Sequence, residues 1–135
     1  MSVPPVYLDT SAVNKLILAE PESEALRVFL ASWPERVASA LVEVEAGRAL
    51  LRTTTVGREA RLRQVLARLT LIGLDSALLQ RAGAIAPASL RSLDAIHLAT
   101  ALSIPGLAGM VVYDQRLAAA AAQHGLQVWS PGRSG

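Results

Sequence analysis

Two aspartates stand directly after short apolar segments that have the composition of buried strands. Asp9 follows Val6–Leu8, and Asp114 follows Met110–Tyr113. In an open α/β sheet of parallel strands, the carboxyl ends of the strands line the crevice where ligands bind. We therefore expect Asp9 and Asp114 to meet at one edge of a sheet, where their carboxylates are available for chemistry.

Two further acids lie inside apolar helical segments. Asp94 stands near the start of LDAIHLATAL, where a helix cap explains it about as well as a ligand role does. Glu45 stands in the middle of LVEVEAGRAL, where a charge is costly unless it is partnered. Glu43 points about 200° away from Glu45 around the helix, so at most one of the two can face a shared crevice.

Converging carboxylates repel one another, and the single lysine of the chain, Lys15, cannot neutralise all of them. A hard divalent cation solves this problem, because Mg²⁺ takes oxygen ligands and keeps waters that can be activated as nucleophiles. Asp75 is a different case, since it begins a helix after Leu71–Leu74 and an N-cap role explains it better. The residues thus indicate an acidic crevice with a metal, bordered by arginines.

Arginines are concentrated in one part of the chain. They make up twelve of the thirteen basic residues, while the net charge is only +2. Six of them fall within 21 residues that contain a single acid, Glu59: Arg48, Arg52, Arg58, Arg61, Arg63 and Arg68. A solvated helical face explains this cluster about as well as a phosphate-binding surface, for which the guanidinium fork is suited.

Strand-like and helix-like segments alternate along the chain. Strands are expected at Val6–Leu8, Arg36–Ala40, Leu71–Leu74, Met110–Tyr113 and Leu126–Trp129. Helices are expected after the N-cap candidates Thr10 and Ser11, from Pro21 to Trp33, and over Leu41–Arg52, Arg58–Leu69, Asp75–Ile85, Leu93–Ser103 and Leu117–Gln123. This order predicts an α/β fold around a mostly parallel sheet of about five strands. We expect one domain over residues 1–135, with a frayed tail from about residue 130.

The composition excludes several classes of protein. At 135 residues and 52% hydrophobic content the chain can bury a real core. It has no cysteine, which excludes disulfides and is compatible with a reducing cytoplasm. No apolar stretch approaches the roughly 20 residues of a membrane span, and no signal peptide is visible. We expect a cytoplasmic protein that does not engage a membrane.

Four segments resemble, in order and spacing, the signature blocks of PIN-domain VapC toxins from type II toxin–antitoxin systems. They are YLDTSAVNKL, SALVEVEAGRAL, LRSLDAIHLATAL and VVYDQRLAAAAAQHGLQVW, and together they run from Val6 to Trp129. The resemblance implies a PIN-like three-layer α/β/α sandwich and a Mg²⁺-dependent endoribonuclease, with Mn²⁺ as a possible substitute. It also implies a VapB-type antitoxin as partner and a homodimer, which is common among PIN toxins.

Carried over block by block, the metal-site acids of the family fall on Asp9, Glu45, Asp94 and Asp114. In such a site a metal-activated water attacks an RNA phosphodiester. Ser11 matches a position whose hydroxyl often supports the first acid, whereas His97 is expected to pack in the core rather than to bind metal. Arg58, Arg61 and Arg68, on one side of their helix, become the expected RNA contacts.

The sequence departs from the family pattern at Val112. Many relatives carry Thr or Ser two residues before the fourth acid, so a hydroxyl that could orient Asp114 or a water of a second metal is missing here.

Two other functions fit part of the pattern. A PIN-like module that has lost catalysis would only bind RNA or a partner, but the presence of all four acids argues against it. A phospho-accepting receiver domain shares the strand-end acid and the α/β alternation. Such domains use a lysine near the late strands, however, and Lys15 comes far too early.

Overall fold

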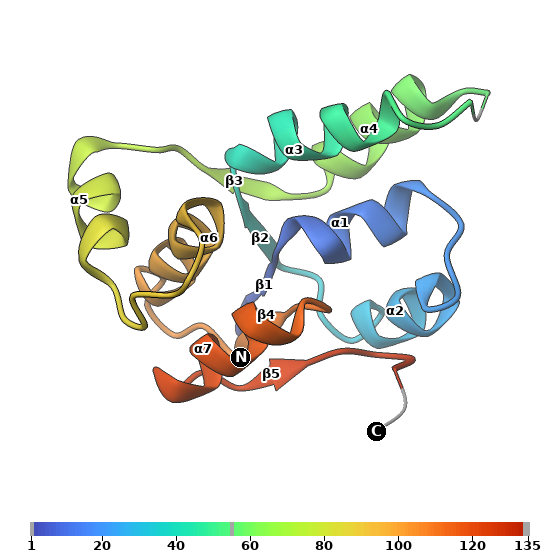
Figure 1. Cartoon of the computed structure of the whole chain (residues 1–135). Helices are drawn as coiled ribbons and strands as arrows, with labels where there is room; N and C mark the ends of the chain where they lie inside the picture. Colours follow the sequence, from blue (N-terminus) through green and yellow to red (C-terminus); the bar gives the residue numbers. More distant parts are fainter. Residues whose placement is uncertain (1, 55, 134–135) are drawn as a thin grey trace.

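The computed structural model describes residues 2–54 and 56–133, and within these ranges the chain forms five strands and seven helices (Figure 1). The strands are β1 (Val6–Leu8), β2 (Arg36–Ser39), β3 (Thr70–Ile72), β4 (Gly109–Val111) and β5 (Val128–Trp129). The helices are α1 (Thr10–Ile17), α2 (Ser23–Leu30), α3 (Leu41–Leu50), α4 (Arg58–Ala67), α5 (Ser76–Ala84), α6 (Ser92–Leu102) and α7 (Gln115–Gln123). None of the helices in these ranges has the length and apolar character needed to cross a membrane.

All neighbouring strands of the sheet pair in parallel, in the order β3-β2-β1-β4-β5. The chain moves from β1 outward to β2 and β3, then returns to the other side of β1 for β4 and β5. The strand order therefore reverses between β1 and β4, and open α/β sheets bind ligands outside the carboxyl ends of the strands at such a reversal. The expectation of a mostly parallel sheet of about five strands is confirmed.

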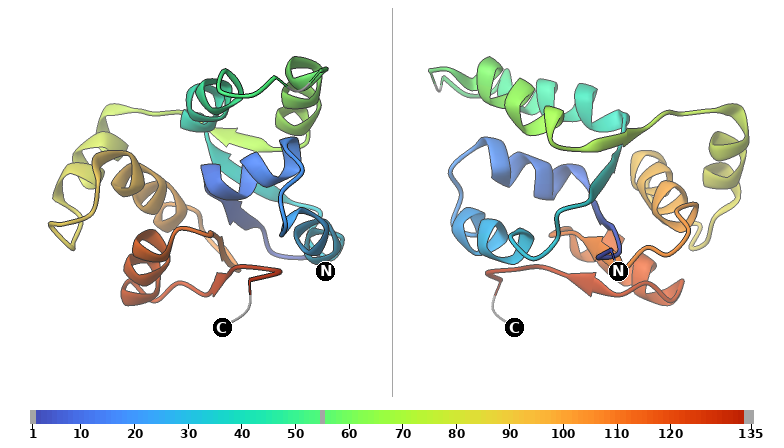
Figure 2. Two further views of the ribbon diagram at one scale, coloured as in Figure 1. Left: turned by 45° about the vertical axis from the view of Figure 1, so that its right-hand side comes forward. Right: turned by 180° about the vertical axis from the view of Figure 1, so that it is seen from behind.

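Helices cover both faces of the sheet (Figures 1 and 2), with α1–α4 on one side and α6 and α7 on the other, where α5 packs against the outside of α6. In β1, Val6 and Leu8 pack against α1, α2 and α3, whereas Tyr7 between them packs against α6 and α7. This alternation follows from the two-residue period of a strand. The sheet thus separates two halves of the core, and the expected three-layer α/β/α sandwich is confirmed.

The beginnings of the first two helices differ from the expectation. Asp9, rather than Thr10 or Ser11, is the N-cap of α1, and its side chain accepts a hydrogen bond from the backbone N–H of Ala12. Pro21 does not begin α2, which starts at Ser23. The hydroxyl of Ser23 instead closes the preceding turn, because it accepts from the N–H of Glu20 and donates to a backbone carbonyl upstream.

The C-terminal tail, expected to fray from about residue 130, is held over residues 130–133. Ser130 Oγ donates to the carbonyl of Val112 at 2.6 Å, and the Tyr113 hydroxyl donates to the carbonyl of Pro131 at 2.7 Å. Arg133 in turn donates to the carbonyl of Tyr113. These bonds tie the tail to the segment that carries the fourth acid, while residues 134–135 lie outside the described residues.

Candidate active site

Asp9 lies at the reversal of the strand order, where β1 ends and α1 begins. Its Oδ1 accepts hydrogen bonds from Ser11 Oγ at 2.6 Å and from the N–H of Ala12 at 3.1 Å. The residue is only 4% exposed. Burial raises the pKa of Asp9 to about 6, although the Ser11 hydroxyl pulls in the opposite direction. At neutral pH the metal-free protein therefore holds a buried, ionised carboxylate at Asp9 whose charge is unfavourable.

Ser11 links the first acid to the segment of the fourth. Its hydroxyl donates to Asp9 and accepts, at 3.0 Å, from the N–H of Tyr113. The next residue, Asp114, is exposed and caps α7, because its Oδ1 accepts from the N–H of Leu117 at 2.9 Å. The ends of β1 and β4 are thus joined by a hydroxyl, and both present an aspartate.

Asp94 lies in the first turn of α6 and is half-buried. Burial raises the pKa of its carboxyl, and the nearby charges of Asp114 and Glu45 raise it further. The charge of Asp94 in turn raises the pKa of Asp9. Asp94 therefore interacts electrostatically with each of the other three acids.

Helix α3 turns Glu45 inward and leaves Glu43 exposed. Thr10 Oγ1 donates to Glu45 Oε1 at 2.6 Å, and His97 Nε2 lies 2.7 Å from the same oxygen. Burial pushes the pKa of Glu45 up, but the bonds from His97 and Thr10 outweigh it, so the net shift is downward. Glu45 is consequently held ionised by partners on α1 and α6.

His97 is 2% exposed and bonded at both ring nitrogens. Its Nδ1 lies 2.7 Å from the hydroxyl of Tyr7, and its Nε2 faces Glu45. Burial, with the charge of Asp9 as the next cause, raises the pKa of Tyr7 well above its ordinary value, so the phenol keeps its proton. His97 packs in the core as expected, and neither nitrogen is free to bind a metal.

Sequence reasoning missed Tyr7 and Thr10 as parts of the site. A weak signal exists for Tyr7, since a phenol within a buried strand requires a partner for its hydroxyl. Nothing in the sequence indicates that this partner is His97, 90 positions away. The sequence predicts Thr10 as a helix cap, a role that Asp9 takes in the structure.

The donor set of the four acids fits Mg²⁺. Across residues 2–54 and 56–133 no three His, Asp or Glu side chains form a ready-made ligand set. Mg²⁺ does not need one, because it commonly binds through one or two carboxylates and keeps several waters. Asp9, Glu45 and Asp114 each use one named oxygen, Oδ1 or Oε1, for hydrogen bonds within the described protein, which leaves the second oxygen for a cation.

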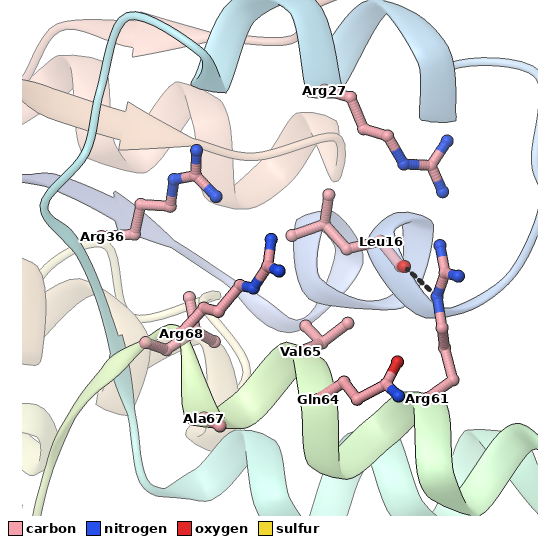
Figure 3. A pocket seen from close by; sticks show the side chains of 9 residues that line it. Leu16, Arg27, Arg36, Arg61, Gln64, Val65, Ala67 and Arg68 are labelled. Atoms are coloured by element: carbon pink, nitrogen blue, oxygen red, sulfur yellow. Dashed lines mark hydrogen bonds between the residues drawn. The ribbon is translucent and has the colours of Figure 1, made fainter.

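The arginines gather at a separate place. Arg61 of α4 and Arg68, directly after α4, line a pocket of about 620 Å³ together with Arg27 of α2 and Arg36 of β2 (Figure 3). Arg36 begins its strand and Arg68 precedes β3, so both lie toward the amino edge of the sheet, away from the acids. The acidic crevice is therefore not directly bordered by these arginines.

This pocket combines positive charge with apolar walls. Leu16, Val65 and Leu69 line it, and Arg61 donates to the carbonyl of Leu16 at 3.3 Å (Figure 3). Burial lowers the pKa of Arg36, and the neighbouring charge of Arg68 lowers it further. The guanidinium groups therefore repel one another, and an anion in the pocket would relieve this repulsion.

Comparison with known proteins agrees with the fold and identifies the family of the chain. The PIN domain family model matches residues 6–123. Ribonuclease VapC46 of Mycobacterium tuberculosis is 45% identical over 127 residues, which cover 93% of this chain and 97% of the relative. The chain therefore belongs to the PIN-domain family, and the resemblance to VapC ribonucleases is confirmed.

Solved structures agree at the level of the fold. VapC20 of M. tuberculosis, described as a toxin that cleaves the sarcin–ricin loop, superimposes with a TM-score of 0.70 at 19% identity, over 85% of this chain and 94% of that one. A toxin–antitoxin complex from Klebsiella pneumoniae gives a TM-score of 0.67 at 21% identity, over 82% and 88% of the two chains.

The burial of Asp9 leads to a stability prediction. Asp9→Asn keeps the cap but removes the buried charge. The folded state holds the Asp9 proton up to about pH 6, whereas the unfolded chain loses it near 3.8. The wild type therefore loses stability as pH rises through this window, and the variant does not. At 1.36 kcal/mol per pKa unit, we expect the metal-free variant to be more stable by roughly 1–3 kcal/mol at pH 8.

Urea unfolding of both proteins at pH 4, 6 and 8 in EDTA measures this difference. The advantage of Asp9→Asn should be absent at pH 4 and complete at pH 8. If the free energies of unfolding of the two proteins differed by the same amount at all three pH values, the Asp9 charge would not be the cause of the difference.

Proposed function

We propose that this protein is a Mg²⁺-dependent endoribonuclease, with Mn²⁺ as a possible substitute, and the toxin of a toxin–antitoxin pair. The proposal is supported by four acids from separate segments, Asp9, Glu45, Asp94 and Asp114. Asp9 and Asp114 follow the neighbouring strands β1 and β4, and the charges of Asp114 and Glu45 act on Asp94. Their mutual charges are linked through Asp94, with no lysine or arginine bonded to any of the four in the described chain. A cation is the natural complement of such a set.

Each acid has a distinct part in this proposal. Asp9 and Asp94, whose carboxyl pKa values are raised, gain most from a neighbouring cation. Glu45 is already ionised and oriented by Thr10 and His97. Asp114 is the exposed acid, at the rim where substrate enters. When bound, Mg²⁺ supplies charge that offsets the phosphate and lowers the pKa of a coordinated water.

The partner in this proposal is a VapB-type antitoxin. A solved toxin–antitoxin complex contains a chain of the same fold, which supports an antitoxin partner. We also propose a homodimer. Exposed apolar side chains at Val44 and Leu51 of the α3 region are compatible with an interface, since each is more than 60% exposed.

Arg58, Arg61 and Arg68 are proposed to hold the RNA backbone. Arg58 lines a second pocket of about 380 Å³ together with Arg27 and Arg61, so the two pockets share residues. Helix α1 starts next to Asp9. Leu16 of the first pocket comes seven residues after Asp9, which places it about 10 Å farther along the helix axis. An extended strand of a few nucleotides covers this separation.

We expect purified protein to cleave RNA in Mg²⁺ but not in EDTA, and the acids to divide into two groups. Asp94→Asn and Glu45→Gln should lose at least about a hundredfold in rate, because each removes a charge that holds the cation. Asp75→Asn and Glu43→Gln are the matched controls, since Asp75 only caps α5 and Glu43 is exposed. Both should stay within about threefold of the wild type.

Cleavage of a fluorescent RNA by the four variants tests this division, with circular dichroism to confirm folding. Full activity of Asp94→Asn would contradict the metal site. Equal losses of cleavage rate in Glu45→Gln and Glu43→Gln would contradict the claim that α3 directs only Glu45 toward the site. A folded wild type that binds RNA without cutting it in Mg²⁺ or Mn²⁺ would identify a catalytically silent PIN-like module instead.

The arginine proposal makes a separate, electrostatic prediction. Each phosphate contact on a single strand contributes a slope of about −0.7 to the dependence of log affinity on log salt. Replacing Arg58, Arg61 and Arg68 with Gln should therefore flatten the slope by roughly two units and weaken different RNA sequences about equally. Titrations in an Asp94→Asn background measure binding without cleavage.

Arg63→Gln is the control, because Arg63 lies on the same helix but lines neither pocket. An unchanged slope in the triple variant would mean that these arginines serve a protein partner or solubility, and that RNA follows another path.

A further inference from the structure

Two hydrogen-bond donors from different helices converge on one oxygen of Glu45. Thr10 Oγ1 is 2.6 Å from Oε1, and His97 Nε2 is 2.7 Å from the same atom. Within residues 2–54 and 56–133 no donor is bonded to Oε2. The two carboxylate oxygens therefore have different roles, one fixed by the protein and one left open.

The histidine is itself fixed in a single orientation. An ionised carboxylate can only accept, so the hydrogen of the ring must be on Nε2, which lies 2.7 Å from Glu45 Oε1 and 3.1 Å from Thr10 Oγ1. In the neutral ring Nδ1 then carries a lone pair, which the Tyr7 hydroxyl meets as a donor at 2.7 Å. The Tyr7 and His97 rings also meet edge to face, with centroids 6.0 Å apart. The tautomer and the ring plane are thus set by the core.

This chain of contacts crosses the sheet. Tyr7 projects from the middle of β1 toward α6, His97 is carried by α6, and Glu45 approaches from α3 on the other face. Tyr7 and His97 are both at least 98% buried, so no water competes for their bonds. A displacement of α6 relative to α3 would move the Glu45 carboxylate directly.

Resting on the proposed metal-dependent function, we infer that His97 is a positioning residue, which together with Tyr7 orients Glu45 so that Oε2 faces the cation. His97 does not touch metal or RNA. It supplies a hydrogen bond to the far oxygen of a ligand, and such outer partners typically contribute about ten- to a hundredfold to metal affinity.

Two amide variants separate this role from simple packing. The side chain of Gln places an N–H near the position of Nε2, so His97→Gln preserves the donor to Glu45. The shorter side chain of Asn matches Nδ1 instead, so His97→Asn preserves the acceptor for Tyr7 and loses the donor to Glu45. Both variants replace the ring with an amide. If His97 had only a packing role, their Mn²⁺ affinities would not depend on whether the hydrogen bond to Glu45 is kept.

The test is calorimetric titration of each metal-free protein with Mn²⁺ at constant pH, without RNA, beside thermal unfolding. We expect His97→Asn to weaken Mn²⁺ binding by about ten- to a hundredfold, and His97→Gln, the conservative variant, to rescue most of that loss. In a Glu45→Gln background the two variants should bind Mn²⁺ equally, because the oriented ligand is already gone.

The inference would be overturned if the two variants bound Mn²⁺ with equal affinity, or if their difference persisted in the Glu45→Gln background. The proposed function would still stand in that case, provided that the wild type binds Mn²⁺ and cleaves RNA. A wild type that binds no Mn²⁺ would overturn both. Should His97→Asn fail to fold, Tyr7→Phe decides, since it keeps the ring of Tyr7 and removes the donor to Nδ1. Weaker Mn²⁺ binding by Tyr7→Phe supports the inference, and unchanged binding overturns it.

Discussion

Acids at the carboxyl ends of neighbouring parallel strands lie at the same edge of the sheet, so their negative charges are held close together and repel one another. Asp9 illustrates the constraint most sharply, because it is nearly inaccessible to water and yet must cap α1. The backbone of α1, the hydroxyl of Ser11 and the end of β4 are all arranged around this one side chain. Its raised pKa shows that these bonds do not compensate fully for burial.

In three of the four acids, Asp9, Glu45 and Asp114, one carboxylate oxygen is hydrogen-bonded within the described protein and the other is not. Oδ1 of Asp9 and Oδ1 of Asp114 complete the first turns of α1 and α7, which stabilises the helices that begin at the sheet edge. Oε1 of Glu45 is held by α1 and α6 in the same manner. The fold and the proposed chemistry thus use different oxygens of the same residues. Loss of the charge at Asp9 is therefore expected to increase the stability of the fold and to decrease the proposed activity.

The parts of the site that depend on local pattern could be predicted from the sequence. An acid after an apolar strand places Asp9 and Asp114 at the edge of a parallel sheet. The helical period shows that Glu43 and Glu45 face different ways, and the family resemblance selects Glu45. The cap of α1 was harder, because Asp9, Thr10 and Ser11 are consecutive and each has a suitable oxygen. Only the structure shows which of them accepts the N–H of Ala12.

The parts that depend on tertiary contacts could not be predicted. Tyr7 and His97 are polar residues in apolar segments, and their pairing depends on how α6 packs on β1. Arg27 and Arg36 join Arg61 and Arg68 only because α2, β2 and α4 converge on one pocket. The arginine cluster is visible in the sequence, but its distance from the acids is not.

The central claim, that buried carboxylates are held for a cation, is tested most directly by the protons released on metal binding. Because the pKa of Asp9 is about 6 and that of Asp94 is also raised, a cation that binds the ionised forms must displace protons near pH 6. Calorimetry with Mn²⁺ in buffers of different ionisation enthalpy counts them. We expect roughly half a proton or more per ion at pH 6 and almost none at pH 8. Binding without proton release at pH 6, or no binding at either pH, would contradict the account.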